Sequence, residues 1–109
     1  MAYDEKTARR VRQRLTGRRG FAEQKMFGGL AFLVNGHMCC GVLDDTLVLR
    51  LGEDGARAAL QQPHTAPMDF TGKPMKSMVY VRAEGHRTAA QLRRWVEQAV
   101  TYALALPKK

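Results

Sequence analysis

The sequence lacks the residue patterns that build metal centres and disulfide frameworks. It has only two cysteines, the adjacent Cys39 and Cys40, and neither a CxxC pair nor a His-x-x-x-His spacing. Successive side chains of a strand point to opposite faces, so these two thiols suit neither a disulfide with each other nor a shared metal ion. We therefore expect two reduced, structural thiols, and we predict no metal and no cofactor.

The sequence also lacks any apolar run near the roughly 20 residues that a transmembrane helix needs. Its first residues, MAYDEKTARR, contain no apolar core of the kind found in secretory signal peptides. We therefore predict a cytoplasmic protein with no membrane partner. A length of 109 residues, without repeats, low-complexity segments or a linker, predicts a single domain over residues 1–109.

Catalytic motifs are missing as well. The only serine, Ser77, lacks the flanking glycines of a hydrolase nucleophile elbow. The pair Gly28-Gly29 precedes the strand-like run LAFLV rather than a helix, which indicates a bend between strands and not a phosphate-binding loop. We predict no enzyme, no catalytic residues and no small-molecule substrate. The remaining enzymatic alternative is a site in the loop at residues 63–75 that joins His64, Asp69 and Lys73.

The apolar residues that are present follow helix-like and strand-like spacings in turn. Three helices are predicted: from Asp4 to about Thr16, from Gly52 to before Pro63, and from the capping box of Thr88 and Gln91 to Pro107. The predicted strands are residues 24–27, 30–34, 37–43, 46–51 and 76–81. The order α-β-β-β-β-α-β-α predicts an α+β fold of two layers, an antiparallel sheet of about five strands that helices cover on one face.

Two short turns predict the register of the sheet. Asn35-Gly36 is a strong signal for a two-residue hairpin, and Asp44-Asp45 is a weaker one. With both turns, Phe32 would pair with Cys39, and one face would meet the helices. The residues predicted on that helix-facing side are Ala31, Leu33, Met38, Cys40, Val42, Leu47, Leu49 and Leu51.

The opposite face is predicted to be half apolar, with one arginine and one histidine among its residues. Its predicted residues are Leu30, Phe32, Val34, His37, Cys39, Leu43, Thr46, Val48 and Arg50. Such a mixed face suggests a partner or partial cover. The candidate partner-binding residues are therefore Phe32, Val34, His37, Leu43, Val48 and Arg50.

Positive charge gathers at the two ends of the chain. The net charge is +8, of which residues 1–22 carry +5 (seven basic, two acidic) and residues 83–109 carry +3 (five basic, two acidic). Such asymmetry is typical of a surface that faces nucleic acid, and equally of a solvated face. The candidate nucleic-acid-binding residues are Arg9, Arg10, Arg12, Arg14, Arg18 and Arg19.

Four blocks of the sequence resemble one known family. The blocks MFGGLAFLVNGHM, LVLRLG, PMDFTGKPMKSMVYV and LRRWVEQAVTYALALPKK, in this order and spacing, are similar to the TfoX N-terminal domain family. The resemblance implies a two-layer α+β fold and no catalytic residues. The family is named for regulators of bacterial natural competence, which act as transcriptional coactivators and usually carry a second, C-terminal domain. We accordingly expect a stand-alone, single-domain member.

The leading hypothesis is a non-enzymatic regulatory or interaction module that binds a protein partner or a second copy of itself as a homodimer. The alternative is direct, non-specific binding of nucleic acid through the basic first helix. The least favoured reading is an enzyme with a site in the 63–75 loop.

Overall fold

The structure, a computed structural model, describes residues 3–18, 20–26, 28–68 and 75–107. Its sheet has six strands in the order β1-β2-β3-β4-β6-β5, and every neighbouring pair is antiparallel. The strands are β1 (Ala22–Met26), β2 (Gly29–Val34), β3 (His37–Leu43), β4 (Thr46–Arg50), β5 (Thr65–Met68) and β6 (Met75–Val81). The α-helices are α1 (Glu5–Leu15), α2 (Gly52–Ala59) and α3 (Ala89–Ala105), with a 3-10 turn η1 (Ala83–Gly85) before α3.

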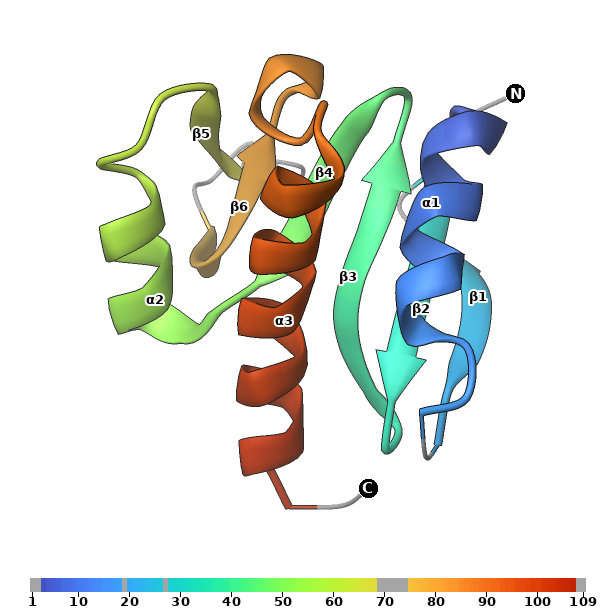
Figure 1. The fold of residues 1–109 in the computed structure, drawn as a ribbon. Coiled ribbons are helices and arrows are strands. Elements are labelled where there is room, and N and C mark those ends of the chain that lie inside the picture. The colour runs from blue at the N-terminus through green and yellow to red at the C-terminus, as the bar shows by residue number, and fades with distance from the viewer. Residues whose placement is uncertain (1–2, 19, 27, 69–74, 108–109) are drawn as a thin grey trace.

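The three helices cover one face of this sheet (Figure 1). Buried residues of all three belong to the same apolar cluster as the inner side chains of the sheet. The predicted two-layer α+β architecture is therefore confirmed. One strand was missed: β5 lies inside the segment predicted to be a loop, where its short, Pro-containing TAPM sequence gives little strand signal. It pairs with β6 at the edge of the sheet.

The helix ends follow their local sequences. Asp4 accepts a hydrogen bond from the backbone N–H of Thr7 and caps α1. Thr88 and Gln91 form the predicted capping box at the start of α3, because each side chain accepts from the other's backbone N–H.

The turns also follow the sequence. Asn35 and Gly36 have φ of 54° and 82°, as a type I′ turn requires. Met26 pairs with Gly29, and Gly28 has φ of 77°, so the glycine pair turns the chain from β1 into β2 and opens no helix.

The predicted register of β2 on β3 is correct near the turn and wrong beyond it. Leu33 pairs with Met38 as expected, but Phe32 pairs with Cys40. Cys39 is therefore an extra residue on β3, a β-bulge, and each later residue of β3 meets a partner one position away from the predicted one. The register of β3 on β4 is confirmed from Leu43–Thr46 to Cys40–Leu49.

The bulge overturns part of the predicted faces. Phe32 and Val34, predicted to face outward, are 0% and 1% exposed and belong to the helix-covered core, as do Leu30 and Cys39. Ala31 and Leu33 alternate with these residues and so lie on the outer side, and Met38 packs against the outer cluster. A one-residue slip exchanges the two faces of a strand, which is the physical reason for the error. The predicted inward residues confirmed in the core are Cys40, Val42, Leu47, Leu49 and Leu51.

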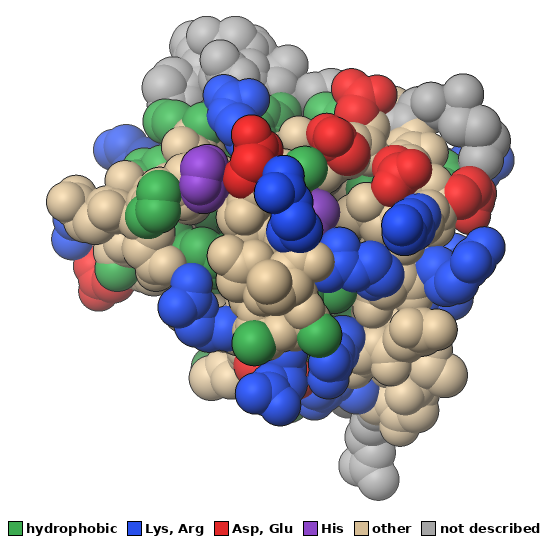
Figure 2. Space-filling model, turned by 45° about the horizontal axis from the view of Figure 1, so that its top comes forward, with side chains coloured by type: hydrophobic (Ala, Val, Ile, Leu, Met, Phe, Trp, Pro, Cys, Tyr) green, Lys and Arg blue, Asp and Glu red, His purple; other side chains and the backbone are tan. Residues whose placement is uncertain are grey.

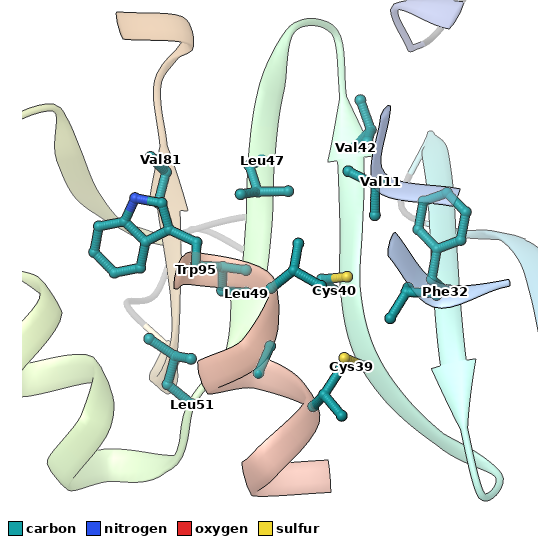
Figure 3. Close-up of a cluster of buried hydrophobic side chains, with 14 of the residues drawn as sticks. Val11, Phe32, Cys39, Cys40, Val42, Leu47, Leu49, Leu51, Val81 and Trp95 are labelled. Atoms are coloured by element: carbon teal, nitrogen blue, oxygen red, sulfur yellow. The ribbon is translucent and has the colours of Figure 1, made fainter. Parts of the chain in front are cut away.

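Figure 3 shows how α3 packs against this core. The indole of Trp95 lies against Val81 of β6, and Leu47 and Leu49 of β4 lie beneath the helix. Val11 of α1 lies near Phe32 at the other side of the cluster. Among the described residues, no helix is long and apolar enough to span a bilayer.

Candidate interaction surfaces

The outer face of the sheet carries a second, smaller apolar cluster. Val48, Met68 and Met78 are buried there, and Met38, Leu43 and Tyr80 are partly buried against them. A hollow of about 390 Å³ opens nearby, lined by Leu43, Asp44, Thr46, Ala66, Pro67, Tyr80 and Arg82. The outer face therefore carries both apolar and polar residues, as expected. Only some of these residues are the ones that the sequence predicted for it.

The six predicted partner-binding residues do not share one surface. Phe32 and Val34 lie under the helices, whereas Leu43 and Val48 lie on the outer face. The imidazole Nε2 of His37 is 2.5 Å from the carbonyl oxygen of Pro107. The guanidinium of Arg50 lies over the ring of Tyr102 in α3, 5.8 Å from its centroid. The β-bulge and these two side-chain contacts separate residues that strict alternation would place together.

Half of the predicted nucleic-acid-binding arginines make contacts within the protein. Arg10 donates hydrogen bonds to the carbonyls of residues 86–88 and so ties α1 to the start of α3. Arg12 forms a two-pronged ion pair with Glu23 of β1 at 2.6 and 2.9 Å, which raises the pKa of the guanidinium. Arg18 pairs with Glu97 of α3.

Arg9 and Arg14 make no ion pair with any residue that the structure describes, and Arg19 lies outside the described residues. Figure 2 shows Lys and Arg side chains spread across the helical side of the molecule. The charge expected from the sequence is therefore present on this side, although internal contacts hold part of it.

Of the three residues in the predicted enzymatic site of the 63–75 loop, the structure describes only His64. His64 is exposed, has φ of 65°, and accepts a hydrogen bond from the N–H of Arg82 through its backbone carbonyl. Asp69 and Lys73 lie outside the described residues. Within the described part of the chain, no group of three or more His, Cys, Asp or Glu side chains could hold a metal ion.

The two cysteines lie together in the core. The bulge turns both Cys39 and Cys40 toward the helices, where each is free and fully buried, which corrects the prediction that they face opposite sides (Figure 3). A hydrogen bond with Cys39, together with burial, raises the pKa of the Cys40 thiol well above its usual value. Such a thiol stays protonated and is a poor nucleophile.

A groove between α2 and α3 is the surface that sequence reasoning missed. Its volume is about 740 Å³, and apolar atoms contribute most of the surface that its walls expose. Small residues of α2 form one wall, and polar residues of α3 form much of the other. The lining residues are Leu51, Gly55, Ala58, Ala59, Gln62, Arg94, Glu97, Gln98, Thr101, Tyr102 and Ala105.

The two helices are antiparallel along this groove. Arg94 donates to the side-chain oxygen of Gln62 at 3.0 Å, beyond the C-terminal end of α2, whereas Tyr102 lies beside Gly52 at its N-terminal end. The sequence signal for the groove was the run of Gly and Ala in GEDGARAA, because small side chains cannot fill the space between two helices.

An open antiparallel sheet that one layer of helices covers on one face defines a two-layer α+β domain. The chain matches the model of the TfoX N-terminal domain over residues 13–103, which is most of its length. It therefore belongs to the TfoX N-terminal domain family, which is not known as a family of enzymes. No curated protein and no solved structure matches the chain.

Proposed function

We propose that this protein is a regulatory protein-interaction module whose binding surface is the groove between α2 and α3. The observation that carries the proposal is an open, largely apolar hollow of about 740 Å³ on the helical layer. Monomeric proteins bury most such surface, and an exposed apolar groove with a polar rim is typical of a site for another protein. A role in transcription, as the family's name implies, fits a module of this kind.

Site-specific photo-crosslinking in the source cells tests this proposal. Ala58 is exposed and lines the groove, so a photoreactive residue at this position should give a discrete crosslinked product. Ala90 is an exposed alanine of α3 that does not line the groove, and the same residue there is the matched control. Absence of a product from position 58, or the same products from both positions, would overturn the proposal.

Binding of nucleic acid is a second candidate function, supported by Arg9 and Arg14 of α1, which form no ion pair with the described residues. Phosphate contacts from such residues give an affinity that falls steeply with salt. Duplex DNA should bind at low ionic strength and lose affinity in the Arg9→Ala/Arg14→Ala variant. Arg10 is unsuitable for this test because its substitution also removes the hydrogen bonds to residues 86–88. If the duplex does not bind even at low salt, this candidate is eliminated.

A further inference from the structure

Two arginines lie near the ends of the α2–α3 groove. Arg94 lies at one end, 5.4 Å from the ring centroid of Trp95, and its hydrogen bond goes to the neutral Gln62. Arg50 does not line the groove itself, but its guanidinium lies over the ring of Tyr102, which lines the other end. Neither guanidinium has a carboxylate partner among the residues that the structure describes.

The acidic groups near the groove do not offset these two arginines. Glu97 lines the groove but pairs with Arg18 of α1. Asp54 of α2 pairs with Arg57, and both of these side chains are largely exposed to solvent. The groove is therefore a largely apolar channel with an arginine near each end that has no carboxylate partner in the described part of the chain.

The spacing along α3 sets how far apart the two ends of the groove lie. Arg94 and Tyr102 are eight residues apart on α3, or about 12 Å along the helix axis. The guanidinium of Arg50 lies over the ring of Tyr102. The same length separates the ends of α2, which has eight residues. A helical ligand that runs along the groove would reach both arginines from positions seven or eight residues apart, which lie on the same face of a helix.

An extended peptide fits this groove less well than a helix does. Its described lining comes from α2, α3 and the two residues Leu51 and Gln62 that flank α2, and it includes no strand edge. A strand would therefore find no row of backbone groups to pair with. A helix satisfies its own backbone hydrogen bonds and presents only side chains to the groove.

We propose that the α2–α3 groove binds an amphipathic helix of a partner protein, with an apolar face two turns long and a carboxylate near each end that pairs with Arg50 and Arg94. The inference rests on the proposed function and gives the chemistry of the partner at that same site. The pairs fix the register of the bound helix, and the apolar contact supplies most of the affinity.

Selection from a displayed library of helical peptides tests the proposal on the whole chain. Enriched peptides should carry apolar residues at i, i+3 or i+4, and i+7, with Asp or Glu near both ends. A synthetic peptide of the consensus should bind at least about tenfold more weakly to the Arg50→Glu/Arg94→Glu chain, because both rim pairs become contacts between like charges. The Arg93→Glu variant is the matched control, because Arg93 is an exposed neighbour of Arg94 that neither lines the groove nor lies over a ring that lines it.

A charge-reversed peptide separates lost pairing from lost folding. With Lys in place of the two acidic residues, it should bind the Arg50→Glu/Arg94→Glu chain and fail to bind the unchanged one. Enrichment of neutral or basic peptides would overturn the inference. So would equal binding of the consensus peptide to the unchanged chain, the Arg93→Glu chain and the Arg50→Glu/Arg94→Glu chain. If the peptide result overturns this inference but position 58 still gives a crosslinked product, the proposed function as an interaction module is retained. If position 58 gives no product either, the proposed function is also overturned.

Discussion

The indole Nε1–H of Trp95 donates a hydrogen bond to the carbonyl oxygen of Gly85 at 3.1 Å, in the buried contact between α3 and the turn that precedes it. The residues that join β6 to α3 are thus held by the first half of α3 itself. Gly85 is buried, and a Cβ there would lie 2.6 Å from Cγ1 of Val81, so only glycine permits this approach without a shift.

The Trp95→Phe variant should lose about 1–3 kcal/mol of unfolding free energy, because it leaves the buried Gly85 carbonyl without its donor. Gly85→Ala should be destabilised through the contact with Val81 instead. Urea denaturation followed by circular dichroism measures both. Unchanged midpoints in the two variants would mean that this contact contributes nothing to stability.

The capping box of α3 gives a second prediction. Thr88→Ala should reduce the unfolding free energy by about 1 kcal/mol, because it removes the acceptor of the Gln91 backbone N–H. Thr101 is an exposed threonine within the same helix, so Thr101→Ala is the control and should change stability by less than about 0.5 kcal/mol. Thermal or urea denaturation distinguishes them, and equal losses would contradict the capping role.

The β-bulge predicts a difference between two neighbouring residues of β2. Phe32 is fully buried under the helices, so Phe32→Ala should cost about 3–5 kcal/mol of unfolding free energy. Leu33 is half-buried on the outer side, and Leu33→Ala should cost about 1 kcal/mol. The reverse order of the two losses would support an unbulged register instead.

Both thiols should resist modification in the folded protein. Burial and the hydrogen bond between Cys39 and Cys40 raise the pKa of Cys40, so little thiolate forms near neutral pH. A thiol reagent at pH 8 should react on the order of a hundredfold or more slowly in buffer than in denaturant, where both thiols are exposed. Rapid reaction of the native protein would show that this part of the core opens readily.

The helix cap at Asp4 predicts a dependence of stability on acid. The hydroxyl and the backbone N–H of Thr7 donate to the Asp4 carboxylate at 2.6 and 3.0 Å and lower its pKa below the usual 3.8. The folded state therefore favours the ionised form. The resulting stabilisation is present above the unfolded-state pKa and is lost as the pH falls through the lower folded-state value.

The Asp4→Asn variant keeps a good capping side chain but cannot ionise. Its urea midpoint should be lower than that of the unchanged protein at pH 6, and the difference should shrink as the pH approaches 2. A difference that stays constant between these pH values would show that ionisation of Asp4 does not contribute.

Local sequence alone determined where the chain turns and where its helices begin. Asn35-Gly36, the Thr88–Gln91 box and the apolar spacing of α3 involve residues close together in the chain, and the structure has each as predicted. The order of the helices and the first four strands also followed, and with it the two-layer architecture.

Tertiary structure decided what depends on contacts between distant residues. The extra residue at Cys39 has no local signal, because a bulge depends on how β3 pairs with β2 and on which side chains the core buries. It moved Phe32 and Val34 into the core. Likewise β5 forms only by pairing with the edge of β6. The α2–α3 groove exists because α2 packs mainly on β6, and its small side chains leave the space beside α3 open.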